Sequence, residues 1–370
     1  MTELSVHAPE ILWEDGDLLL YRAVPDGEAL PVLAAMPSTA PPSREAIARL
    51  QHAYKLRDQL DPAWAARPLR LVTERGRLTL LSEDPGGEPL LRLMGHPWEI
   101  ASFLRFAIGL AAALARFHER GLIQKDIKPA NILVNKATWA VWLTGFGIAS
   151  HLPRERQAPG STEAIAGTLA YTAPEQTGRM NRSIDSRSDL YACGITLYET
   201  ITGSLPFSAS DPLEWIHCHI ARAPTPPSER VYGIPGPIDA IILKLLAKSP
   251  EDRFQTAAGL EADLRACLTA WEAHRQIDPF PIGARDVRNL VGKVALIGFD
   301  ALPEALGEVK AGNLTATIEQ KPGGQSRRVV DILVAFLRDG EKPTEQVTQL
   351  APVAITRNNV GEAESIGEVK

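Results

Sequence analysis

This chain of 370 residues is poor in cysteine, which occurs only as Cys193, Cys218 and Cys267. The number is odd, and the three positions lie too far apart to form the close pairs that bind zinc. The sequence therefore gives no sign of a disulfide framework or of a cysteine-based metal centre. Reduced thiols are the expected state, as is typical of a cytoplasmic protein.

The chain also lacks an excess of positive charge, since 39 Lys and Arg face 45 Asp and Glu, for a formal net charge of −6. A composition of this kind does not favour nucleic acid or an anionic membrane as a partner. Residues 1–10, MTELSVHAPE, contain neither a basic segment nor the apolar run of a secretory signal. We therefore expect a cytoplasmic location.

Long hydrophobic runs are missing as well. The longest apolar stretch extends from Phe103 to Phe117 and is interrupted by Arg105 and Arg116, which predicts a buried helix rather than a membrane span. Hydrophobic residues make up 45% of the chain, which is enough to fill a sizeable core. The length exceeds that of one typical domain, so we expect two units.

The most informative segment that is present is QKDIKPANILVN at residues 124–135. An Asp is followed by a Lys two residues later and an Asn five residues later, and an apolar strand comes directly after them. This is the catalytic-loop pattern of Ser/Thr protein kinases. In phosphoryl transfer, Asp126 would accept a hydrogen bond from the substrate hydroxyl and Lys128 would offset phosphate charge. Asn131 would supply an amide oxygen to Mg²⁺. A surface turn that merely contains proline would not need this constellation.

The resemblance to Ser/Thr protein kinases continues along the chain. Ala173-Pro174-Glu175 matches the element that ends the activation segment, and Thr168 lies where these kinases place a threonine near the catalytic loop. The resemblance implies that Asp189 braces the catalytic-loop backbone and that Arg253 forms an ion pair with Glu175. It also implies an α+β, bilobal protein-kinase-like fold that uses ATP and Mg²⁺.

Several residues that the kinase reaction uses are missing from this sequence. The Gly-rich loop is reduced to Gly16, which is followed by Asp17, so the backbone cannot approach phosphates closely. Ala35 stands where the third strand should carry a lysine, and Ala53 stands where the next helix should offer its glutamate. Gly145 of Gly-Phe-Gly replaces the Asp that holds Mg²⁺. The remaining candidates for ATP contacts are Gly16 and the hinge residues Ser82 and Asp84.

A more specific resemblance, over residues 10–288, is to the kinase domains of large bacterial multidomain signalling proteins. In those proteins a kinase domain precedes an NTPase module and a sensor histidine kinase. The segments GFGIASHLPRERQAP, GTLAYTAPEQTGRMNRSIDSRSDLY and RQIDPFPIGARDV carry this resemblance. It implies a cytoplasmic signalling role with protein partners. The NTPase module is absent from this sequence.

From about residue 293 the pattern changes to alternating strands and helices, which indicates α/β wiring. The segments GFDALPEALGEVKAGNLTATIEQKP and PVAITRNNV resemble the C-terminal end of periplasmic sugar-binding proteins. By that resemblance, Asp300 and Gln320 would bind sugar hydroxyls; alternatively, they cap local structure. About 75 residues provide only part of a two-lobed cleft, so we expect a fragment left by gene fusion, with sugar not favoured as a partner.

We therefore expect an N-lobe at 1–95, a C-lobe at 96–275, a linker at 276–292 and an α/β fragment of periplasmic-binding-protein type at 293–370. Losing one preorganised charge-stabilising group costs roughly 3–4 kcal/mol, so the lysine, glutamate and aspartate losses together cost at most about 9–12 kcal/mol. This predicts a pseudokinase-type signalling module. The alternatives are a weakly active Ser/Thr kinase that uses Asp126 and Asn131, and sugar sensing by the C-terminal fragment.

Overall fold

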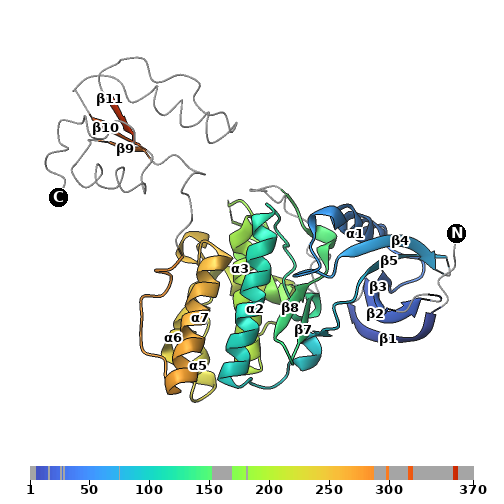
Figure 1. Ribbon diagram of the computed structural model, residues 1–370, viewed down its shortest axis with the longest axis horizontal. Helices are drawn as coiled ribbons and strands as arrows, with labels where there is room; N and C mark the ends of the chain where they lie inside the picture. Colours follow the sequence, from blue (N-terminus) through green and yellow to red (C-terminus); the bar gives the residue numbers. More distant parts are fainter. Residues whose placement is uncertain are drawn as a thin grey trace. The chain divides into compact units, whose positions relative to one another are not determined.

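The computed structural model describes residues 6–15, 17–25, 27, 30–74, 76–151, 169–180, 182–286, 297–299, 316–319 and 353–356. The chain divides into two units, Met1–Val287 and Arg288–Lys370 (Figure 1), each of which is described by itself. Gly16, Thr168, Asp300 and Gln320 lie outside the described residues.

The first unit begins with an antiparallel five-stranded sheet of order β1-β2-β3-β5-β4, shown in blue in Figure 1. Its strands alternate between two buried faces: Leu20 and Leu33 belong to one apolar cluster, and Tyr21 and Ala34 to another. This alternation is the period-2 pattern visible in the sequence. The strands are β1 (Val6–Asp15), β2 (Leu18–Pro25), β3 (Val32–Pro37), β4 (Pro68–Glu74) and β5 (Arg77–Glu83).

One helix, α1 (Arg44–Lys55), packs against this sheet. Ser43 caps it by accepting a hydrogen bond from the backbone N–H of Ala46, and the buried side chains are Ala46, Leu50 and Ala53. The helix ends at Lys55, and a short 3₁₀ turn, η1 (Arg57–Gln59), follows.

The C-lobe follows as a mainly helical body with a small sheet of order β6-β7-β8. The predicted α+β organisation is therefore confirmed for the first unit. The remaining elements are β6 (Glu88–Pro89), η2 (Leu90–Leu93), α2 (Ile100–Glu119), η3 (Pro129–Asn131), β7 (Ile132–Asn135), β8 (Ala140–Leu143), η4 (Phe146–Ile148), η6 (Leu169–Tyr171), η7 (Pro174–Thr177), α3 (Ser186–Thr202), α4 (Pro212–Ala221), α5 (Pro227–Arg230), α6 (Gly236–Leu245), η8 (Pro250–Asp252) and α7 (Ala257–His274).

Helix α2 lies at the centre of the C-lobe. Within the part of the chain that the structure describes, it is the one helix long and apolar enough to cross a membrane. Its apolar residues are nevertheless buried inside the protein, including Phe103, Phe106, Leu110 and Phe117, and it packs against α3, α7 and β8. The structure therefore agrees with the prediction of a buried core helix over this stretch.

Residues 276–286, which we name the C-terminal strap, pack on the C-lobe instead of beginning a linker. Ile277 is buried, and the backbone N–H of Gly283 and the guanidinium of Arg285 both contact the fully buried Asp263. Asp286 accepts hydrogen bonds at the start of α7 from the backbone N–H of Gln255 and from the N–H and hydroxyl of Thr256. The division between the two units accordingly falls at Val287.

We predict that Asp286→Ala lowers the free energy of unfolding by about 1–3 kcal/mol, because it leaves donors at the start of α7 without their acceptor. Asp278→Ala is the matched control, since Asp278 is exposed in the same strap and accepts a hydrogen bond from the side chain of Gln276. Equilibrium urea unfolding of the full chain measures both. Equal midpoints for the two variants would show that the strap does not stabilise the C-lobe.

The second unit contains a three-stranded sheet of order β11-β10-β9, built from β9 (Ile297–Phe299), β10 (Ala316–Glu319) and β11 (Val353–Thr356). Strand β10 is parallel to β9 and antiparallel to β11. These strands lie in the segments VALIGFD, TATIEQ and PVAITRNNV, where the sequence predicts strand or extended chain. The helices predicted between them lie outside the described residues.

Candidate functional site

The buried carboxylate of Asp189 on α3 fixes the backbone of the catalytic-type loop by hydrogen bonds. This carboxylate accepts hydrogen bonds from the backbone N–H groups of Gln124 and Lys125, at 2.9 and 2.8 Å, and lies 2.9 Å from Nε2 of His118. Because two backbone donors are fixed at once, the loop conformation follows from α3. The bracing role that the resemblance implied for Asp189 is confirmed.

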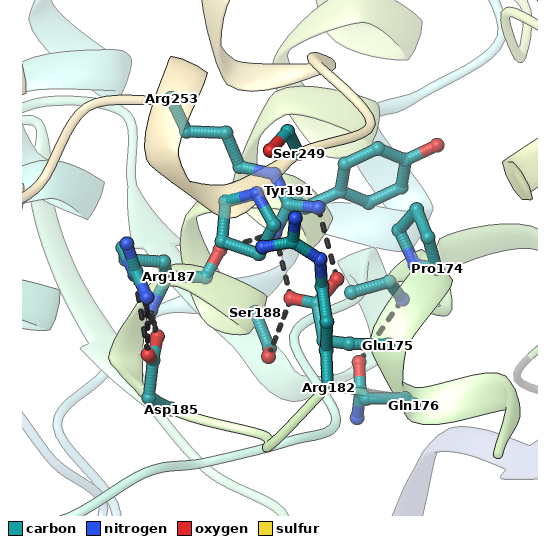
Figure 2. Close-up of polar contacts among 12 residues, drawn as sticks. Pro174, Glu175, Gln176, Arg182, Asp185, Arg187, Ser188, Tyr191, Ser249 and Arg253 are labelled. Carbon is teal, nitrogen blue, oxygen red and sulfur yellow. Dashed lines mark hydrogen bonds and ion pairs between the residues drawn. The ribbon is translucent and has the colours of Figure 1, made fainter. Parts of the chain in front are cut away.

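A buried ion pair fixes the segment after the loop. Figure 2 shows the Arg253 guanidinium facing the Glu175 carboxylate, with Nη1–Oε1 and Nη2–Oε2 distances of 2.7 and 2.9 Å. The hydroxyl of Ser188 also donates to Glu175. Both charged side chains are at most 1% exposed, and the Arg253 donors also bond carbonyls of Arg187, Ala247 and Lys248. The predicted pair exists with its remaining donors satisfied, which is the condition for burying two charges.

The three predicted catalytic residues lie together. Nδ2 of Asn131 donates to Oδ2 of Asp126 and to its carbonyl, both at 2.8 Å. Nζ of Lys128 lies 3.3 Å from the same Oδ2. The other oxygen, Oδ1 of Asp126, is buried without a hydrogen-bond partner. The fold thus brings the three residues of the catalytic-type loop into contact.

Lys128, however, is engaged by a residue from the N-lobe. Its Nζ lies 2.9 Å from Oδ2 of Asp15, at the end of β1, and its side chain is buried. Burial alone lowers the pKa of Lys128, but the carboxylates of Asp126 and Asp15 outweigh it and raise the pKa above its ordinary value. The charge available for a phosphate is therefore already neutralised. Nothing in the sequence indicated this role for Asp15.

The Asn131 side chain occupies the space next to Gly145, where kinases carry the metal-binding aspartate. Gly145 has a left-handed backbone with φ +75°, and a Cβ built on it would lie 2.4 Å from Cγ and Oδ1 of Asn131. A second contact closes this region: Gln124 donates from Nε2 to the carbonyl of Thr144 and accepts the N–H of Asp126. No role was predicted for Gln124, although it is the first residue of the segment 124–135 that carries the catalytic-loop pattern.

We predict that Gly145→Ala destabilises the chain by about 1–3 kcal/mol more than Gly121→Ala does. Both glycines have positive φ, at +75° and +72°, but a Cβ at Gly121 meets nothing within 4 Å. The control therefore carries the backbone strain without the collision. Urea unfolding measures the difference, and adding Asn131→Ala should remove it. An unchanged difference in that background would show that Asn131 does not occupy this space.

The N-lobe side of the cleft is apolar. Trp13 packs with Leu12, Leu20 and Leu33 of the sheet and with residues of the catalytic-loop side in one buried cluster, which also includes Ala66, Ala130 and Leu133. Ala35, at the position of the missing lysine, packs against this cluster. Ala53 is buried on α1, so no ion pair links β3 with that helix. Leu33 on β3 is paired with Ser82 on the neighbouring strand β5, which places the cluster next to the hinge.

The hinge candidates have different environments. Ser82 is partly buried on β5, whereas the carboxylate of Asp84 is 1% exposed and is held by Arg22, with an Nε–Oδ2 distance of 2.5 Å. Oδ1 of Asp84 also accepts the backbone N–H of Gly86. The Asp84 side chain therefore maintains the hinge and is not free to contact a ribose.

Arg22 belongs to a cluster that we name the clasp, which connects β1 and β2 with the hinge and η2. Arg22 and Arg92 both bind Glu10 and Glu88, with Arg92 Nη1 2.5 Å from Glu10 Oε1 and 3.1 Å from Glu88 Oε2. Hydrogen bonding from Arg92 chiefly lowers the pKa of Glu10. Arg92 also donates to the carbonyls of Leu12 and Ile11, so the start of the C-lobe is bonded to the β1 backbone beside Trp13.

Comparison with known families agrees with this geometry. The family model described as "Protein kinase domain" matches residues 70–264, which is more than half of the chain. The chain belongs to the protein kinase family. The match begins in β4, after the positions where Gly16, Ala35 and Ala53 replace kinase residues. The C-lobe therefore carries most of the family likeness.

The curated relatives are bacterial Ser/Thr protein kinases. Serine/threonine-protein kinase PknB of Mycobacterium tuberculosis is 43% identical over 152 residues, covering 41% of this chain and 24% of the relative. Probable serine/threonine-protein kinase CE0033 of Corynebacterium efficiens is 40% identical over 172 residues, covering 45% and 26%. Probable PknB of Corynebacterium glutamicum is 38% identical over 194 residues, covering 50% and 29%. The chain spans about a quarter of the length of these relatives.

Proposed function

We propose that this kinase-family chain is a pseudokinase-type signalling module that acts in the cytoplasm by binding protein partners. The observation that carries the proposal is the engagement of the loop's phosphate-handling lysine by Asp15. An ion pair made at 2.9 Å inside the protein competes directly with a phosphate for the same ammonium group.

The residues do not fit a complex of ATP with Mg²⁺, which protein kinases generally use. Kinases hold Mg²⁺ through an aspartate and the catalytic-loop asparagine, and here Asn131 faces Gly145. Among the described residues, no group of three or more His, Cys, Asp or Glu side chains is placed to hold a metal ion. The space beside the hinge contains Trp13 and Leu33. Adenine binding would require these buried side chains to move.

One observation favours a second candidate, the weakly active Ser/Thr kinase. Asp126, Lys128 and Asn131 keep their mutual geometry, and Oδ1 of Asp126 lacks a hydrogen-bond partner, as a group that receives a substrate hydroxyl would. Against it stand the lost lysine, glutamate and aspartate, which in other enzymes cost roughly 10²–10³ in rate for one such group. Sugar sensing has no such support, and we propose the second unit as a fused fragment.

We predict that ATP at about 1 mM, with or without Mg²⁺, leaves the unfolding midpoint of the full chain unchanged. A ligand present at 1,000 times its dissociation constant would instead stabilise the fold by about 4 kcal/mol. Thermal-shift titration measures this, with a related active kinase as the positive control. A magnesium-dependent shift that corresponds to low-micromolar affinity would contradict the proposal. Transfer of labelled phosphate that Asp126→Asn abolishes would establish the weak kinase instead.

A further inference from the structure

A second site lies on the face of α1 that looks toward η4. A pocket of about 440 Å³ is lined there by α1 and by Gly147 and Ile148. The helix approaches the loop closely because residue 147 has no side chain: a Cβ at Gly147 would lie 2.8 Å from Cβ of Arg49. Nε2 of His52 donates to the carbonyl of Ala149 at 2.6 Å and fixes the same wall. The pocket is therefore a built feature of the first unit.

The charge of the pocket is predominantly positive. Arg49, His52 and Lys55 follow one another at intervals of three residues, so they lie along one side of α1 and all line the pocket. Glu45 is the one acidic residue in the lining, and it bonds Nη2 of Arg49 at 2.8 Å. Nε of Arg49 is buried and has no hydrogen-bond partner. The Arg49 side chain is 24% exposed, so its guanidinium, which keeps one donor without an acceptor, can bind an anionic group that enters the pocket.

The size and lining of the pocket favour an acidic peptide over a small inorganic anion. Its volume of about 440 Å³ is many times the roughly 10–15 Å³ of such space that one water molecule needs, so a small inorganic anion would fill only a small part of it. Ile148 contributes an apolar side chain that is 39% exposed, and Gln51 adds an exposed amide that can bond a peptide backbone. A peptide that carries an acidic side chain next to an apolar one could contact the basic residues and Ile148 at the same time.

We propose that this pocket is the docking site for an acidic segment of a protein partner, which binds a Glu or Asp carboxylate through Arg49 and Lys55 and an apolar side chain against Ile148. The inference deepens the proposed partner-binding function and rests on it. Its location differs from that of the nucleotide cleft, since the pocket lining shares no residue with the apolar cluster or the clasp.

The test is fluorescence anisotropy of the full chain with a short labelled peptide that is rich in glutamate and carries one central leucine. We expect binding that weakens with salt, and no binding of the same peptide with glutamine in place of glutamate. Arg49→Met and Lys55→Met should each weaken affinity about tenfold, the loss typical of one hydrogen bond between charged groups. Arg44→Met is the matched control, since Arg44 is exposed on α1 and does not line the pocket.

Equal affinity of the glutamine peptide, or unchanged affinity in both pocket variants, would overturn the proposal. Displacement of the peptide by low concentrations of inorganic phosphate would also overturn it, by showing a small-anion site. Lys55 is exposed, so its replacement leaves folding intact and keeps the test decisive. ATP titration separates the two hypotheses: nucleotide binding would contradict the pseudokinase, whereas failure of the peptide alone would contradict only the docking site.

Discussion

The structure depends on one constraint: a charged side chain that is taken out of water must be paired. Among the described residues, the charged residues buried in the core include Lys128, Glu175, Asp189, Arg253 and Asp263. Each has a partner of opposite charge or backbone donors. Removing one partner of such a pair costs about 3–5 kcal/mol, because it strands the other charge. This cost explains why Glu175 and Arg253 occur together in the folded chain.

The same constraint explains how the catalytic-type loop is arranged. The ammonium group of Lys128 is buried and therefore needs a negatively charged partner. The carboxylates of Asp15 and Asp126 are these partners. Once Asp15 is placed at the end of β1, that strand lies against the loop side, and Trp13 fills the neighbouring space with apolar contacts. The clasp then bonds the backbone of β1 to Arg92. The pairing of Lys128 with Asp15 and the apolar packing around Trp13 are thus two aspects of one arrangement.

The sequence predicted those parts of the site whose residues lie in one local motif or have a fixed partner in the kinase family. Asp126, Lys128 and Asn131 lie within six consecutive positions, and the roles of Asp189 and Arg253 follow from the family resemblance. The contact between Asp15 and Lys128 joins residues 113 positions apart, and a lone Asp at a strand end carries no signal of it. Trp13 fits an ordinary strand pattern, and that pattern does not show which neighbours its side chain packs against.

Asp84 was predicted to bind the cofactor because of its hinge position. Its carboxylate binds Arg22 instead, and Arg22 lies on another strand, so the sequence around Asp84 does not show this contact. The C-terminal strap lies inside the segment that was expected to be a linker, and its specific contacts come from Ile277 and Asp286.

The central claim is that the chain's own side chains occupy the places of the nucleotide and its metal. A crystal structure grown in saturating ADP and Mg²⁺ tests it most directly. The account predicts that Asp15 stays on Lys128, Asn131 stays beside Gly145, and Trp13 stays within the apolar cluster, with no nucleotide next to Ser82. Density for a nucleotide at the hinge, with Trp13 displaced and the ammonium group of Lys128 turned from Asp15 to a phosphate, would contradict it.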